Sequence, residues 1–126
     1  MRKIRTAVIG CGAISDIYLT NLKNMFLVID LAGCCDLDIA KRDAAAAKHG
    51  IAALTMDEIL ADPSIELVVN LTAPQAHFSV IRQLLEGGKH VYTEKVLSTE
   101  LDEARELVRL ADERGLYLGA APDTFL

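Results

Sequence analysis

Hydrophobic and polar positions divide the chain into short apolar runs that alternate with longer periodic segments. The run 67–71 is almost continuously apolar, which is typical of a strand covered on both faces. The segment 77–85 instead repeats its apolar residues at helical spacing. The same patterns predict strands at 4–9, 28–35, 52–54, 67–71, 90–93 and 116–121. They predict helices at 13–25, 39–49, 56–60 and 77–85, and a last helix that opens at 99–102 and ends at Gly115.

Capping residues support two of these helices. Gly50 is placed to end the helix 39–49, because glycine readily adopts the left-handed conformation of a C-terminal cap. Thr99 can cap the last helix with its hydroxyl, and the acidic residues of the first turn complement the positive end of the helix dipole. The last helix therefore has the clearest start in the chain.

The order of these elements predicts the fold class. Strands that alternate with helices form a parallel sheet through right-handed crossovers, with helices on both faces. We expect a doubly wound, three-layer α/β/α domain of the Rossmann type over residues 1–121, with a mostly parallel sheet in the order 3-2-1-4-5-6.

Composition limits the partners. The 126 residues are 52% hydrophobic and carry a formal charge of −5, which disfavours nucleic acid because phosphate binding needs clustered Lys and Arg. No run of about 18 apolar residues offers a membrane span. Cys11, Cys34 and Cys35 are odd in number and lack metal-ligand spacing. This pattern favours free thiols in a reducing cytoplasm over a disulfide framework.

A glycine turn, "VIGCGAIS", follows the first predicted strand. Gly10 permits the tight turn, and Gly12 lets a pyrophosphate approach the backbone, which a Cβ would block. The helix that begins near Ala13 and Ile14 then directs free N–H groups at the phosphates. Ser15 stands where a third glycine is usual, and glycine turns also occur for backbone reasons alone. The turn therefore becomes specific only in combination with the acidic residue described next.

Asp36 ends the second predicted strand and is followed by Leu37. A carboxylate at this point accepts hydrogen bonds from the adenosine ribose and repels a 2′-phosphate, so the pattern predicts a dinucleotide site that prefers NAD over NADP. An alternative is that Asp36 caps the next helix, although Asp38 is better placed for that role. Lys41 and Arg42 could reach a 2′-phosphate, or could be solvated on a helix face.

These segments, together with "VVNLTAPQAH" and "GGKHVYTEKVLSTELDEARELVRLADERG", resemble the glucose–fructose oxidoreductase / inositol dehydrogenase / MocA (Gfo/Idh/MocA) family of NAD(P)-dependent oxidoreductases. The resemblance covers essentially the whole chain. It implies that Lys95 is the catalytic lysine near the nicotinamide, and that Glu94 positions this lysine or contacts the cofactor. The alternative is an exposed Glu-Lys pair where a strand ends. Val96 stands where the family has proline, which restricts the backbone before it.

The resemblance also assigns a role to the residues that follow the fourth predicted strand. Residues 71–74, namely Leu71, Thr72, Ala73 and Pro74, are expected to line the central part of the cofactor. His77 belongs to the same "T-x-P-x-x-H" stretch and either contacts the cofactor or fills space below the loop, with the second role favoured. The carboxyl end of the sheet is where ligands bind in open α/β folds.

The family adds a larger domain after this one, which supplies most contacts to a small-molecule substrate such as a sugar or polyol. Residues 122–126 are interpreted as the start of the crossing to that domain, so we expect the chain to bind NAD without turnover and to associate into a homo-oligomer through exposed apolar surface. One alternative function is a non-catalytic NAD-sensing or interaction module. Another is a methyltransferase, which also combines a glycine turn with an acidic residue after the second strand.

Overall fold

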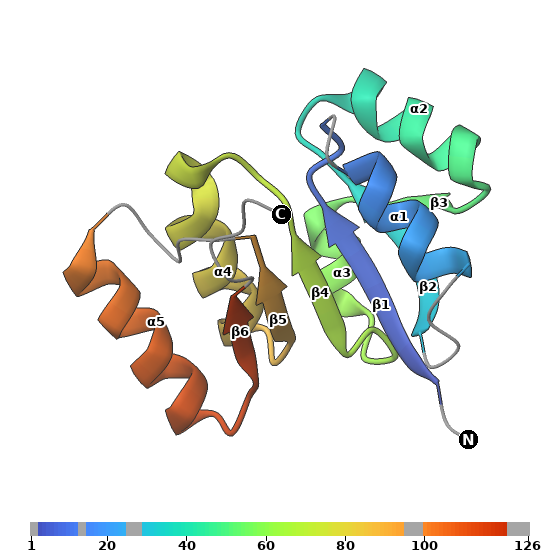
Figure 1. The fold of residues 1–126 in the computed structure, drawn as a ribbon. Helices are drawn as coiled ribbons and strands as arrows, with labels where there is room; N and C mark the ends of the chain where they lie inside the picture. Colours follow the sequence, from blue (N-terminus) through green and yellow to red (C-terminus); the bar gives the residue numbers. More distant parts are fainter. Residues whose placement is uncertain (1–2, 13–14, 25–28, 95–99, 121–126) are drawn as a thin grey trace.

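A computed structural model describes residues 3–12, 15–24, 29–94 and 100–120. Its strands form one six-stranded parallel sheet in the order β3-β2-β1-β4-β5-β6, which confirms the predicted fold class (Figure 1). The strands are β1 (Ile4–Ile9), β2 (Ile29–Cys35), β3 (Ala52–Ala53), β4 (Leu67–Asn70), β5 (His90–Thr93) and β6 (Leu118–Ala120). The helices are α1 (Ser15–Asn24), α2 (Ile39–His49), α3 (Met56–Ala61), η1 (Pro74–Ala76), α4 (His77–Glu86) and α5 (Leu101–Glu113).

The sheet separates two apolar cores. One core joins the sheet to α3, α4 and α5 and contains Ile59, Ile81 and Leu107. The other joins the opposite face to α1 and α2 and contains Val8 and Leu19. The carboxyl ends of β1, β2 and β4 lie side by side at one end of the sheet.

The helix caps agree with the sequence at α2 and differ at α5. Gly50 ends α2 in the left-handed conformation with φ of 64°, as predicted. The N-cap position of α5 is Glu100, so the prediction of Thr99 as the cap was one residue too early. Thr99 itself lies outside the described residues.

The start of the sixth strand differs from the predicted one, because the backbone N–H groups before it donate hydrogen bonds outside the sheet. The sixth strand begins at Leu118 and not at residue 116. The N–H of Leu116 donates to Ala111 O at the end of α5 (2.9 Å), and the N–H of Tyr117 donates to Nδ1 of His90 (2.9 Å). These two residues therefore close the turn after α5 before the strand begins.

Lys89 is a buried lysine whose role the sequence analysis did not predict. Its side chain is 3% exposed, and Nζ donates to Asp62 O (2.6 Å) and Ile65 O (2.7 Å). Burial lowers the pKa of this lysine, while the Asp62 carboxylate partly opposes that shift. The ammonium group thus fastens the turn between α3 and β4 to the start of β5.

Replacement of this ammonium should destabilise the fold. In a Lys89→Met variant the carbonyls of Asp62 and Ile65 lose a charged donor, and we expect a loss of about 2–3 kcal/mol in the free energy of unfolding. Denaturant unfolding measures it, with Lys3→Met at an exposed position as the control. Equal stability of the two variants would contradict this role.

Candidate functional site

The glycine turn is held between the ends of β2 and β4. The N–H of Gly10 donates to Cys35 O (2.8 Å), and the N–H of Leu71 donates to Ile9 O (2.7 Å). Gly10 has φ of 103°, and a Cβ at this position would lie 2.6 Å from the carbonyl carbon of Leu71. The protein's own backbone therefore requires glycine at position 10, both for conformation and for space.

Gly12 is different from Gly10. A Cβ added to Gly12 would meet no atom within 4 Å in the part of the chain that the structure describes. The space above Gly12 is therefore open, and packing inside the protein gives no reason for a glycine there.

Asp36 connects the end of β2 to the glycine turn. Its Oδ2 accepts the N–H of Cys11 (2.7 Å), and its Oδ1 accepts the N–H of Asp38 (2.8 Å). The N-cap of α2 is Asp38, whose side chain accepts the N–H of Lys41 (3.2 Å). The interpretation of Asp36 as a helix cap was therefore wrong, and its carboxylate instead faces the turn.

A hollow of about 570 Å³ opens above these carboxyl ends. The predicted residues that line it are Gly10, Gly12, Asp36, Leu37, Leu71, Thr72 and Ala73. Further lining residues that the sequence analysis did not assign to the site are Ile9, Cys35, Met56, Ala76, Ser79, Val80 and Gln83. Lys41 also lines the hollow, whereas Arg42 pairs with Asp43 (3.0 Å). The site is therefore built by β1, β2, the segment that follows β4, and the helices α2, α3, η1 and α4.

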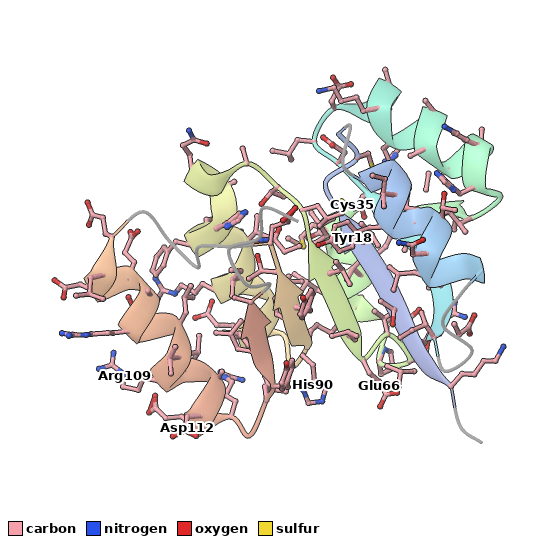
Figure 2. The ribbon with its side chains drawn as sticks, in the orientation of Figure 1. Tyr18, Cys35, Glu66, His90, Arg109 and Asp112 are labelled. Atoms are coloured by element: carbon pink, nitrogen blue, oxygen red, sulfur yellow. The ribbon has the colours of Figure 1, made fainter. Side chains whose placement is uncertain are left out.

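Leu37 is fully exposed at this hollow, with its side chain at 101% of the reference accessibility. This apolar side chain lies at the opening of the hollow, beside glycine backbone and a carboxylate. It offers a surface on which a flat ring of a ligand can pack. Figure 2 shows Cys35 near this upper end of the sheet, while Glu66 and His90 lie at the opposite end.

Asn70 is a buried polar residue that sequence reasoning missed. Its side chain is fully buried, Nδ2 donates to Thr93 Oγ1 (3.1 Å), and Oδ1 accepts the hydroxyl of Thr72 (2.8 Å). Its carbonyl also accepts the N–H of Glu94 (3.1 Å). One residue thus links the exits of β4 and β5. The signal in the sequence is an amide that interrupts an otherwise apolar run.

His77 and Glu94 are not among the residues that line the hollow. His77 is 1% exposed at the start of α4, and its Nε2 lies 2.7 Å from Thr72 O. This geometry agrees with a residue that supports the loop from below. Burial and the Glu94 carboxylate raise the pKa of Tyr18, so Glu94 lies close to α1. The side chain of Pro74, and the predicted site residues Ala13, Ile14 and Lys95, are outside the described residues, as is Val96.

The three cysteines are unbridged and buried, Cys11 in the glycine turn and Cys34 and Cys35 at the end of β2. A hydrogen bond with Cys34, burial and nearby negative groups raise the pKa of Cys11, and the same hydrogen bond lowers that of Cys34. Burial and the neighbouring Asp36 carboxylate raise the pKa of Cys35 above its ordinary value of 9.0. The surroundings of the three cysteines therefore favour the protonated thiol form of Cys11 and Cys35.

The raised pKa of Cys35 predicts a loss of stability in alkali. Below the unfolded value near 9.0 both states keep the proton, so the thiol does not affect the pH dependence of stability. Above it the unfolded chain releases a proton that the folded chain retains, and the free energy of unfolding falls by up to about 1.4 kcal/mol per pH unit. A Cys35→Ala variant should therefore lose less stability between about pH 7 and about pH 10 in denaturant titrations. Identical losses in the two proteins would exclude this thiol as a cause.

Among the described residues, no group of three or more His, Cys, Asp or Glu side chains could hold a metal ion. Of the helices described, none is both long and apolar enough to cross a membrane.

A parallel sheet in the order 3-2-1-4-5-6, a glycine turn after β1 and an acidic residue after β2 define the class of dinucleotide-binding domains. Comparison with known proteins supports the same class. Residues 4–121 match the model of the Gfo/Idh/MocA family, described as an oxidoreductase family with an NAD-binding Rossmann fold. The chain belongs to this family, and it is an NAD-binding domain.

Individual relatives extend well beyond the matched region. The chain is 34% identical over 125 residues to the uncharacterized oxidoreductase C115.03 of Schizosaccharomyces pombe (strain 972 / ATCC 24843). This match covers 94% of this chain and 33% of that protein. Among solved structures, GenD2 from gentamicin A biosynthesis in complex with NAD has a TM-score of 0.90 at 29% identity, covering 96% of this chain and 35% of that one. UDP-N-acetylglucosamine 3-dehydrogenase GnnA from Acidithiobacillus ferrooxidans has a TM-score of 0.86 at 28% identity, covering 95% and 38%. The chain thus spans about a third of the length of these relatives.

Proposed function

We propose that the hollow above the glycine turn holds the adenosine and pyrophosphate parts of NAD. The observation that carries this proposal is the contrast between the two glycines. Gly10 is required by the protein's own backbone, whereas a Cβ added at Gly12 would meet no atom of the described residues within 4 Å. A glycine with open space above it fits a pyrophosphate that must approach the main chain closely, with the N-terminus of α1 nearby.

Asp36 would hold the adenosine ribose in this arrangement. Each of its oxygens accepts one backbone N–H, and a carboxylate offers about four lone-pair sites, so acceptor capacity remains for two ribose hydroxyls. The two N–H groups also fix the orientation of the carboxylate before any ligand arrives. The same negative charge would disfavour the 2′-phosphate of NADP, while Lys41 at the hollow would reduce that preference.

The reaction class that fits is hydride transfer between nicotinamide and a hydroxylated substrate such as a sugar or polyol. When bound, the nicotinamide supplies the hydride chemistry. Lys95, one residue after Glu94, would place an ammonium group near the substrate oxygen, where it stabilises the negative charge that develops when the hydroxyl loses its proton. The name of GnnA, a UDP-N-acetylglucosamine 3-dehydrogenase, supports a substrate with a sugar hydroxyl.

The chain is much shorter than its relatives, which are about three times as long. This difference bears on whether the chain alone can catalyse a reaction. We therefore propose that residues 1–121 form the cofactor domain, that residues 122–126 begin the crossing toward a substrate domain, and that the 126 residues alone bind NAD without catalysing oxidation.

Calorimetric titration tests this function. We expect saturable binding of NAD, binding of NADP at least tenfold weaker, and no displacement of NADH by S-adenosylmethionine. Incubation with NAD and a panel of polyols and sugars should produce no NADH. Tighter binding of S-adenosylmethionine than of NAD would overturn the assignment, and NADH production by the chain alone would overturn the division between cofactor binding and catalysis.

A further inference from the structure

Asn70 is a buried amide whose hydrogen bonds reach beyond its own strand. Both Asn70, the last residue of β4, and Thr93, the last residue of β5, are fully buried, and the two residues are partners in the parallel register of these neighbouring strands (Figure 1). A buried amide is costly unless its polar atoms are hydrogen-bonded, whereas an apolar side chain of similar shape needs no such partners. Packing in the sheet therefore does not by itself require an amide at this position, and its hydrogen bonds indicate its role.

The orientation of the amide is fixed by a backbone donor. The N–H of Thr72 donates to Oδ1 of Asn70 (3.3 Å), and because a backbone N–H can only donate, the atom that it faces is the amide oxygen. On the other side Nδ2 donates to Thr93 Oγ1 (3.1 Å), and the Thr93 hydroxyl donates to the carbonyl oxygen of Asn70 (3.4 Å). The directions of donation in this network therefore follow from groups that can act in only one way.

The Thr72 hydroxyl has a single proton, and Asn70 accepts it. Oδ1 of Asn70 carries no hydrogen, so the hydroxyl must be the donor across the 2.8 Å that separate the two oxygens. The remaining bonding capacity of the hydroxyl consists of lone pairs, which can only accept. Thr72 lines the hollow above the glycine turn. Its side chain therefore offers a ligand in that hollow an acceptor and not a donor.

His77 holds the same loop residue from another element. Its imidazole is 1% exposed at the start of α4, and Nε2 lies 2.7 Å from Thr72 O. Two buried polar side chains, one from β4 and one from α4, thus converge on Thr72. They fix the loop before a ligand arrives, which lowers the ordering cost that binding would otherwise have to overcome.

An acceptor at this position suits only certain groups of the dinucleotide. The pyrophosphate oxygens are acceptors themselves, so they gain nothing from the Thr72 hydroxyl, whereas ribose hydroxyls can donate. In this fold each half of the sheet binds one mononucleotide, and β4 begins the second half, while Asp36 follows β2 in the first half. The ribose beside the nicotinamide therefore matches the end of β4 in both position and chemistry.

We propose that Asn70 is a positioning residue for the nicotinamide half of NAD. By accepting the proton of Thr72, it fixes the Thr72 hydroxyl as the acceptor for a hydroxyl of the nicotinamide ribose. Asn70 is fully buried and acts only through Thr72. This inference rests on the proposed function, because it requires NAD in the hollow. It leaves the pyrophosphate to the glycine turn.

Calorimetric titration with three ligands separates this role from a structural one. ADP lacks the second ribose, ADP-ribose contains it, and NAD adds the nicotinamide. Asn70→Leu keeps the approximate shape of the side chain without its hydrogen bonds, and Thr72→Val removes the hydroxyl. We expect each variant to lose about fivefold in affinity for NAD and ADP-ribose, as for one neutral hydrogen bond, and to bind ADP like the parent chain. Thr72→Ser keeps the hydroxyl and should bind all three ligands like the parent chain.

Thr93→Val is the matched control. It removes a buried hydroxyl from the same network, so it should lower thermal stability as Asn70→Leu does. The N–H and the hydroxyl of Thr72 still donate to Asn70 Oδ1 in this variant, so its affinities for the three ligands should equal those of the parent chain. A double variant, Asn70→Leu with Thr72→Val, should bind NAD no more weakly than Thr72→Val alone, because Asn70 acts through that one hydroxyl.

The possible outcomes distinguish this inference from the proposed function. The inference is overturned if Thr72→Val or folded Asn70→Leu keeps the parent ratio of NAD to ADP affinity. It is also overturned if Thr93→Val lowers that ratio as much as Asn70→Leu, or if the losses add in the double variant. Thr72→Val and Thr72→Ser change only a loop residue, so they decide the question even if Asn70→Leu does not fold. A parent chain that binds neither NAD nor ADP would instead contradict the proposed function.

Discussion

A Gly12→Ala variant is expected to keep the fold and to lose about a hundredfold in affinity for NAD. Among the described residues the added methyl group meets no atom within 4 Å, so thermal unfolding should be unchanged. The same methyl group occupies the space that the pyrophosphate needs, and loss of about two charge-assisted hydrogen bonds to backbone N–H groups corresponds to about 3 kcal/mol. Calorimetric titration with NAD measures the affinity.

Gly10→Ala is the matched control. Its methyl group would lie 2.6 Å from the carbonyl carbon of Leu71 at a φ of 103°, so this variant should lose more than about 2 kcal/mol of stability. The two glycines are two residues apart, yet one should affect folding and the other binding. If Gly12→Ala bound NAD as tightly as the parent protein, the pyrophosphate could not lie over the turn.

Replacement of Asp36 by Asn should remove the preference for NAD. The variant loses the negative charge that repels a 2′-phosphate and one acceptor for the ribose hydroxyls. We expect at least a tenfold loss in NAD affinity, about 1.4 kcal/mol, and a ratio of NADP to NAD dissociation constants that approaches one. Lys41 at the hollow favours NADP once the carboxylate is gone. Titration of the variant with both cofactors gives this ratio.

Asp38→Asn is the control for this change. Asp38 lies two residues away and caps α2, and Asn is an equally good N-cap, so both stability and NAD affinity should stay the same. Asp36→Asn should also lose some stability, because its amide group must face either the N–H of Cys11 or that of Asp38. An unchanged cofactor ratio in Asp36→Asn would show that the ribose binds elsewhere.

These predictions rest on residues whose roles follow from local sequence. The fold class and the glycine turn could be predicted because their signals lie in short stretches of neighbouring residues, and Asp36 could be singled out because it follows an apolar run. The strand order follows from the usual connectivity of alternating strands and helices. Periodicity separates strands from helices, and the alternation of the two kinds of segment specifies parallel pairing. The C-terminal cap at Gly50 is equally local, because it depends on the backbone of one glycine.

Residues with distant partners could not be predicted in this way. Asn70 bonds Thr93 across 23 positions, and Lys89 bonds Asp62 across 27. In the sequence Asn70 is a single amide in an apolar run, and Lys89 is one more surface charge. Asn70 acquires its role only when the exits of β4 and β5 lie side by side, and Lys89 only when the turn before β4 lies beside the start of β5.

The sequence by itself determined the sheet, its order and the place of the glycine turn, because backbone conformation and burial pattern depend on short stretches of residues. Only the tertiary structure decided which face each helix covers, since an apolar stripe requires burial and does not name its partner. It therefore decided that Asp36 faces the turn, that Asn70 links two strand exits, and that the α1 side of β4, β5 and β6 carries no helix among the described residues.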